Sequence, residues 1–233
     1  RYVKVAKDYW DAKKSPLFAP SQEGLFVLNL FEDRNLEVLV SKSAVLGSGR
    51  YLIEGKVDGF PDSKVLITYA NGAVSASVDV SLDEKYAINA LGDDLHQVYE
   101  LDPRLIPECS EPLKPAAIDD NAMTSYEAEF AEASELGSGG ADLEYAADES
   151  DTEVWIDVLF AYTNDVLAKY SVDAIMSRID LAIAEANSSF IDSETRARLR
   201  VVHVSQTDYD ENGVLSDGLE RLQDDDDAFM DEV

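Results

Sequence analysis

Cysteine and histidine are scarce in this chain, which limits the chemistry that it can carry. Its 233 residues include one cysteine, Cys109, and two histidines, His96 and His203. A single cysteine excludes an internal disulfide framework. A zinc site needs three or four ligands, and the two histidines lie far apart without an HExxH pattern. We therefore interpret both histidines as strand or surface residues.

Long apolar runs and positive charge are also lacking. No stretch approaches the roughly 18 apolar residues of a membrane-spanning helix. The chain has 48 acidic and 19 basic residues, a formal net charge of −29, which would repel nucleic acids and anionic membranes. We therefore expect no nucleic acid and no membrane among its partners. Walker loops, GxGxxG, GxSxG and paired-cysteine zinc spacings are absent from the sequence as well.

The acidic residues are concentrated in one segment, which predicts the domain organisation. Residues 110–153 contain 13 acidic residues, one lysine, few large apolar side chains and the run Gly-Ser-Gly-Gly at 137–140. Such a segment cannot bury enough apolar surface to fold. We predict a flexible, protease-accessible linker here, between one domain at 1–109 and another at 154–233.

Residues 1–109 have the pattern of a small antiparallel β-rich domain. Asn71-Gly72 is the strongest hairpin signal, because a type I′ turn needs positive φ at both central residues. The run Gly92-Asp93-Asp94 predicts a second hairpin. Short apolar or alternating runs predict strands at 24–31, 51–57, 64–69, 73–80, 85–90 and 95–101. Repeated strands at this spacing indicate an antiparallel sheet or barrel.

Residues 154–233 predict the opening of an α/β domain. The apolar run 154–162 is typical of a buried strand, and Asn164 is placed to cap the helix that follows. The apolar face of that helix is formed by Val172, Ile175, Ile179, Ile183 and Ala186. A strand at 199–204 would pair parallel with the first strand, and an amphipathic pattern runs from 215 to 233. We therefore predict an α+β fold whose α/β part is incomplete.

Acidic clusters near the end of the sequence suggest calcium. Residues 208–213 (DYDENG) place oxygen ligands at alternate positions before a glycine, as a calcium loop does. An EF-hand also needs a bidentate glutamate at position twelve, which is Leu219 here. We therefore interpret 208–213 as an Asx-rich turn and the acidic run 224–227 as a solvated turn. Calcium stays open as a cofactor.

Five segments occur in an informative order along the chain. They read GRYLIEGKVDGFPDSKVLITYANGAVSASVDV, KYAINALGDDLHQVYELD, EVWIDVLFAYTNDVLAKY, IDLAIAEANSSFIDSETRARLRVVHV and LSDGLERLQDDDDAFMDEV. The first two resemble the propeptide of bacterial secreted reprolysin-like (M12B-type) zinc metallopeptidases. The last three are similar to the first strand, first long helix, second strand and following helix of the same family's metzincin catalytic domain. The resemblance covers about residues 45–109 and 153–233.

The resemblance implies the secreted zymogen of a zinc-dependent metalloendopeptidase. That family binds zinc on an HExxHxxGxxH helix, whose glutamate activates the attacking water. The motif does not occur in these 233 residues, so no catalytic residue is transferred and this chain alone is predicted to be inactive. The implied partners are the remainder of the peptidase domain and, for the complete enzyme, protein or peptide substrates.

Cys109 gains a candidate role from the same resemblance. Related zymogens use a propeptide cysteine as an inhibitory zinc ligand, and a thiolate binds zinc strongly. The surrounding Pro-Glu-Cys-Ser lacks the basic residue and glycine of the better-known switch pattern. A spare or buried thiol is the alternative interpretation.

Two other classes of function stay open from the residues. One is a non-catalytic acidic secreted module that binds or inhibits a partner. The other is a calcium-dependent structural protein, whose melting temperature calcium would raise. Independently of these classes, we expect 154–233 to be unstable in isolation, because part of an α/β domain leaves strand edges and helix faces uncovered.

Overall fold

The computed structural model describes residues 1–5, 24–92, 94–105, 153–210 and 215–223. Residues 1–103 and 153–233 belong to one compact unit, and residues 104–152 to a second. Of the second unit, only the end of a short 3₁₀ turn, Pro103–Leu105, is described. The boundaries at 109 and 153 therefore stay a prediction.

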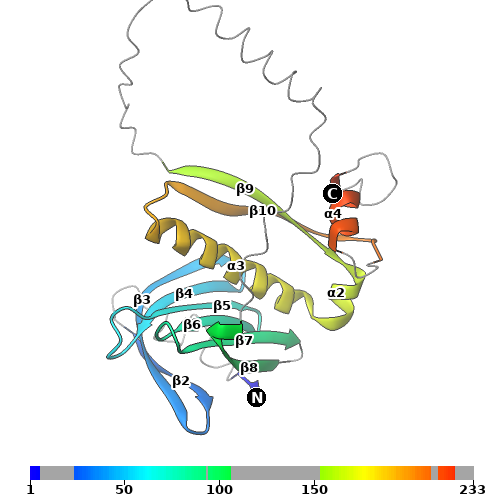
Figure 1. The fold of residues 1–233 in the computed structure, drawn as a ribbon. Coiled ribbons are helices and arrows are strands. Elements are labelled where there is room, and N and C mark those ends of the chain that lie inside the picture. The colour runs from blue at the N-terminus through cyan, green and yellow to red at the C-terminus, as the bar shows by residue number, and fades with distance from the viewer. Residues whose placement is uncertain (6–23, 93, 106–152, 211–214, 224–233) are drawn as a thin grey trace, which may run out of the picture. The chain divides into compact units, whose positions relative to one another are not determined.

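An eight-stranded antiparallel sheet is the largest element of the first unit (Figure 1). Its strands lie in the order β1-β8-β7-β6-β5-β4-β3-β2. Their bounds are Tyr2–Lys4 (β1), Leu25–Phe31 (β2), Arg34–Gly47 (β3), Arg50–Val57 (β4), Lys64–Ala70 (β5), Ala73–Asp79 (β6), Lys85–Gly92 (β7) and Leu95–Leu101 (β8). The α+β class with an antiparallel, β-rich N-terminal part is confirmed.

The two predicted hairpins join neighbouring strands of this sheet. Asn71 and Gly72 have φ of 47° and 112°, and they connect β5 to β6 in an antiparallel pair. Gly92 and Asp94 also have positive φ, 124° and 63°, at the turn between β7 and β8. Turn chemistry therefore predicted both connections, because few residues other than glycine, asparagine and aspartate adopt this conformation readily.

The central strands β5 and β6 are buried on both faces. One face contributes Val65, Ile67, Val74, Ala76 and Val78 to a hydrophobic core that also takes in side chains from β2, β3, β4, β7 and β8. The other face buries Leu66 and the smaller side chains of Thr68, Ala70, Ala73 and Ser75. A sheet buried on both faces needs a second layer, and helix α3 supplies it.

Gly55 allows β4 to approach β3 closely. An added Cβ would lie 2.5 Å from the carbonyl oxygen of Leu39 and 3.1 Å from Cγ1 of Val38. We expect Gly55→Ala to lower the free energy of unfolding by about 1–3 kcal/mol, as overpacking does, in urea denaturation. Gly47→Ala is the matched control, since its Cβ would meet nothing nearer than 4.0 Å; equal losses in the two variants would contradict the close-approach explanation.

The C-terminal part of the unit adds two strands and three helices. They are β9 (Val154–Thr163), α2 (Asn164–Lys169), α3 (Val172–Asp192), β10 (Ala197–Thr207) and α4 (Leu215–Gln223). Strands β9 and β10 pair parallel, as the single long helix between them predicted. Within the described ranges, no helix is both long enough and apolar enough to cross a membrane.

The start of the helical region differs from the prediction. Thr163, not Asn164, caps α2, and its hydroxyl accepts the N–H of Val166 at 3.3 Å. The helix then stops, and Ser171 caps α3 by accepting the N–H of Ala174 at 3.2 Å. Asn164 does not cap the helix, because its side chain is hydrogen-bonded elsewhere: its amide nitrogen donates to Asp208 at 2.6 Å.

Candidate functional site

Helix α3 packs against the outer face of the sheet, on strands β4 to β7 (Figure 1). Its buried residues are Ala174, Ile175, Ser177, Ile179, Asp180 and Ala184. Facing residues on the sheet include Ala70, Ala73 and Ser75, all fully or nearly buried, and such small side chains allow a close helix approach. Because Ser177 and Asp180 are polar, the sheet must also provide hydrogen-bond partners for the hydroxyl and a counter-charge for the carboxylate.

Thr68 on β5 and Ser177 on α3 form a reciprocal hydrogen-bonded pair. The Thr68 hydroxyl donates to the Ser177 carbonyl at 2.7 Å and lies 3.3 Å from the Ser177 hydroxyl. The Ser177 hydroxyl donates in turn to the Thr68 carbonyl at 3.4 Å. Both residues are 0% exposed. A buried hydroxyl without a partner costs about 1–3 kcal/mol, so this pair favours a single register of α3 on the sheet.

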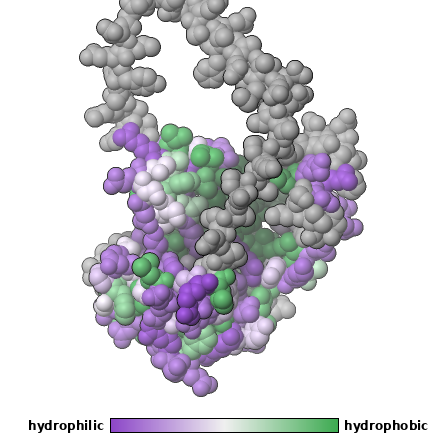
Figure 2. Space-filling view, viewed as in Figure 1, coloured by the Kyte–Doolittle hydropathy of each residue, from purple (hydrophilic) through white to green (hydrophobic). Residues whose placement is uncertain are grey.

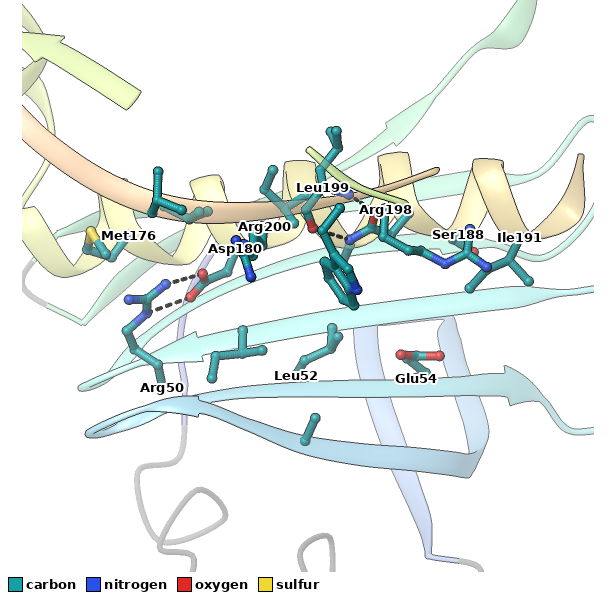
Figure 3. A pocket seen from close by; sticks show the side chains of 18 of the residues that line it. Arg50, Leu52, Glu54, Met176, Asp180, Ser188, Ile191, Arg198, Leu199 and Arg200 are labelled. Atoms are coloured by element: carbon teal, nitrogen blue, oxygen red, sulfur yellow. Dashed lines mark hydrogen bonds and ion pairs between the residues drawn. The ribbon is translucent and has the colours of Figure 1, made fainter. Parts of the chain in front are cut away.

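Arg50 on β4 and Asp180 on α3 form a two-pronged ion pair. The Arg50 Nε donates to Oδ2 of Asp180 at 2.9 Å, and Nη2 donates to Oδ1. Figure 3 shows Arg50 reaching up from the sheet to the helix. The Asp180 side chain is 4% exposed and that of Arg50 24%. The hydrogen bonds to Asp180 raise the pKa of Arg50, so the guanidinium is charged at any physiological pH.

Two further polar contacts hold the ends of α3. Near its N-terminus, the Asn71 amide nitrogen donates to Oδ1 of Asp173 at 2.9 Å. Near its C-terminus, Lys64 pairs with Asp192. Both contacts are exposed, so they contribute little energy individually. They nevertheless extend the polar match between the sheet and the helix from one end of α3 to the other.

A groove of about 790 Å³ runs beside this contact, between β3 and β4, α3, and β10. Its apolar lining includes Leu46, Leu52, Trp155, Met176, Ile183 and Leu199. Leu52, Met176 and Leu199 are labelled in Figure 3. Each lysine, arginine, aspartate and glutamate that lines it is in an ion pair, namely Lys42–Glu54, Arg50–Asp180, Arg198–Glu153 and Arg200–Asp157. The charges of the groove are therefore used to join strands and helix to one another.

Strands β9 and β10 carry large apolar side chains at the surface. They are Val154 (60% exposed), Trp155 (51%), Ile156 (45%), Leu159 (44%) and Val202 (53%). Figure 2 shows hydrophobic side chains gathered over this region. Among the described residues, this sheet has two strands. In the described part of the chain, this two-stranded sheet therefore has apolar side chains at the surface.

The residues singled out from the sequence are not brought together. Cys109 and the acidic run 224–227 lie outside the described residues. His96 is buried in β8 at 1% exposure, and His203 is exposed in β10. In the described ranges, no group of three or more His, Cys, Asp or Glu side chains could hold a metal ion.

The polar residues that join α3 to the sheet were not anticipated from the sequence. They are Arg50, Thr68, Ser177 and Asp180. The structure therefore defines the site as a contact surface between two parts of one chain, and it assigns no catalytic group within the described residues.

The chain is similar to a known metalloendopeptidase over most of its length. No family model matches the chain. The chain is 24% identical over 174 residues to a peptidyl-Asp metalloendopeptidase of Stenotrophomonas maltophilia. The match covers 74% of this chain and 37% of that protein, so the chain spans little more than a third of the relative's length. The similarity indicates a distant relationship to a metallopeptidase.

Proposed function

We propose that this chain is the propeptide and the N-terminal part of the catalytic domain of a secreted, zinc-dependent metalloendopeptidase. The observation that carries the proposal is the match to the Stenotrophomonas enzyme. Because it spans 74% of the chain, it includes residues on both sides of the acidic segment 110–153. The order of the resembling segments supports the same assignment, with 1–109 as propeptide, 110–153 as linker and 154–233 as the start of a reprolysin-like domain.

The contact between sheet and helix supports an inhibitory or templating role for the propeptide. Arg50 and Thr68 offer α3 a charge and hydrogen bonds in one register. A propeptide of this kind would fix the first long helix of the catalytic domain before the linker is cut. Cleavage within 110–153 would leave only these non-covalent contacts to hold the two parts together.

The chain's own residues do not fit a complete zinc centre. The chain has two histidines, and no cluster of three or more metal-ligating side chains occurs among the described residues. A zinc centre needs three or four ligands. In the proposal, the zinc ligands lie in the portion of the precursor that corresponds to the rest of the relative. Cys109 is then the candidate inhibitory ligand, supplied from the end of the propeptide.

The activation site is proposed to lie at aspartates of the linker. The relative's name denotes a peptidyl-Asp endopeptidase, and residues 110–153 contain five aspartates. If the complete enzyme shares that preference, it can process its own linker. An acidic segment with few large apolar side chains is also a site where proteases act readily.

The complete precursor tests the proposal. We expect about one zinc per chain by elemental analysis, low peptidase activity before processing, and a rise of at least tenfold after cleavage between 110 and 153. A matched precursor whose five linker aspartates are changed to asparagine should stay latent longer if processing is autocatalytic. A precursor without bound zinc and without activity after linker cleavage would instead favour the non-catalytic acidic module.

Cys109→Ser in the same precursor separates the switch from the general proposal. Early peptidase activity without linker cleavage would support Cys109 as an inhibitory zinc ligand. Unchanged latency would remove that role, while leaving the propeptide assignment dependent on the zinc and activity measurements.

A further inference from the structure

His96 is buried where the N-terminus of α3 packs against the β5–β6 and β7–β8 hairpins of the sheet. Its Nε2 accepts the backbone N–H of Val74 at 2.9 Å, and its Nδ1 lies 2.9 Å from the carbonyl oxygen of Asp94. Because Nε2 accepts, the proton of the neutral ring is on Nδ1, which donates to Asp94. Both nitrogens are therefore used by backbone groups.

The imidazole replaces a missing part of the sheet ladder. Pairing between β6 and β7 runs from Asp79 opposite Lys85 to Ala76 opposite Ile88. Val74 lies beyond that end, where β7 no longer supplies an acceptor for its N–H. The His96 ring fills this position, so the end of β6 depends on an uncharged side chain for one of its backbone hydrogen bonds.

The same end of the sheet holds the first turns of α3. Ala73 and Ala90 form a small buried cluster with Ala174. The Arg178 guanidinium donates to the Ala90 carbonyl at 3.1 Å, and it lies 4.0 Å from the centre of the Tyr170 ring. Ala90 is also the residue opposite His96 in the ladder between β7 and β8. A displaced His96 ring would therefore disturb α3, because Ala90 pairs with His96 and contacts both Ala174 and Arg178.

The charged groups around the ring come from three elements. Asp94 lies on the turn before β8, and Asp173 from α3 shares a cavity of about 210 Å³ with His96. Arg178 of α3 is on the other side of Ala90, and Lys4 of β1 is opposite Leu95. Carboxylates from the turn and from α3 therefore line the same cavity as the ring.

We propose that His96 is a proton-operated latch that seats the N-terminus of α3 on the sheet and releases it in mildly acidic solution. A protonated ring carries N–H groups on both nitrogens, so Nε2–H would face the Val74 N–H, donor against donor. The end of β6 then loses its acceptor, and the ring is drawn toward the carboxylates of Asp94 and Asp173.

The direction of the pH effect follows from burial. Burial lowers the pKa of His96 below its ordinary value of 6.5, although the Asp94 carbonyl and charge and the Val3 backbone oppose part of this shift. The open form therefore binds more protons than the closed form below about pH 6.5, and the closed form loses stability as the pH falls. Between the pKa values of the open and closed forms, each pH unit changes the population of open molecules about tenfold.

Amide hydrogen exchange on the whole 233-residue chain tests the latch without any assay of peptidase activity. We expect exchange at Val74 and in the first two turns of α3, corrected for the intrinsic pH effect, to be about fivefold faster at pH 5.5 than at pH 6.5, since half of the open molecules already carry the proton at pH 6.5. His96→Gln should abolish this dependence, because its amide oxygen can accept from Val74 but does not titrate. His203→Gln, on an exposed histidine, should behave like the unmodified chain.

A ring titration keeps the proposal testable if His96→Gln does not fold. With two histidines in the chain, the His203 variant assigns both NMR ring signals. The His96 signal should titrate clearly below 6.5, together with loss of Val74 protection. Titration at or above 6.5, or a pH dependence that persists in a folded His96→Gln, would overturn the latch.

Discussion

Replacing Arg50 with alanine is expected to lower the free energy of unfolding of the chain by about 3–5 kcal/mol, the cost typical of breaking a buried ion pair. Asp180 is 5% exposed and would keep a carboxylate in the contact without the guanidinium that compensates it. Urea denaturation followed by far-UV circular dichroism measures the loss. Amide exchange in α3 should increase more than exchange in the sheet core.

Lys42→Ala is the matched control for Arg50→Ala. Lys42 and Glu54 form an ion pair in the same groove, at 3.0 Å, with side chains that are 62% and 33% exposed. An exposed pair of this kind contributes about 0–1 kcal/mol. If the two variants lost equal stability, burial of the Arg50–Asp180 pair would not be the cause.

A combined variant separates the ion pair from the packing around it. Arg50→Leu with Asp180→Leu removes both charges while keeping apolar volume at the contact. We expect this double variant to recover most of the loss, because replacing a buried pair by packed apolar side chains is often neutral. A double variant as unstable as Arg50→Ala would mean that the bidentate geometry, and not the isolated charge, carries the energy.

The strands of the sheet were predictable where turn chemistry marks their ends, and β3 shows why the rest were not. Its first half buries Leu36, Val38 and Val40 in alternation, but none of the following residues is buried and most are exposed. The pairing with β4 shifts between Val40 and Lys42, so one period does not describe the whole strand. Strand β1 has three residues, and its pairing with β8 depends on a distant segment.

The apolar face of α3 was predicted only in part. Ile175 and Ile179 are buried, as expected. Val172 is 49% exposed, while Ser177 is completely buried. Local sequence favours apolar residues in a buried face, and it cannot show that a hydroxyl or carboxylate will meet a partner. The partners here are 109 residues away for Ser177 and 130 for Asp180.

Residues 154–233 expressed alone are expected to be largely unfolded, because the sheet provides most of their buried contact. Among the described residues of this range, the buried hydrophobic ones apart from Tyr209 are Ala174, Ile175, Ile179 and Ala184, all in α3. Burying a large apolar side chain contributes about 1.5–3 kcal/mol, whereas ordering the backbone costs about 1–2 kcal/mol per residue. Circular dichroism at 222 nm should therefore show little helix.

Adding residues 1–109 as a separate polypeptide is expected to restore that helix. The sheet has its own extensive hydrophobic core and is predicted to fold without α3. The same polypeptide with Arg50→Ala should bind at least about 100-fold more weakly, since 1.4 kcal/mol corresponds to tenfold in affinity, while one with Lys42→Ala should bind almost normally. If the 154–233 fragment were helical both with and without residues 1–109, α3 would need no template. Helix formation that depends on Arg50 would mean that the N-terminal sheet selects the conformation of the segment that follows the linker.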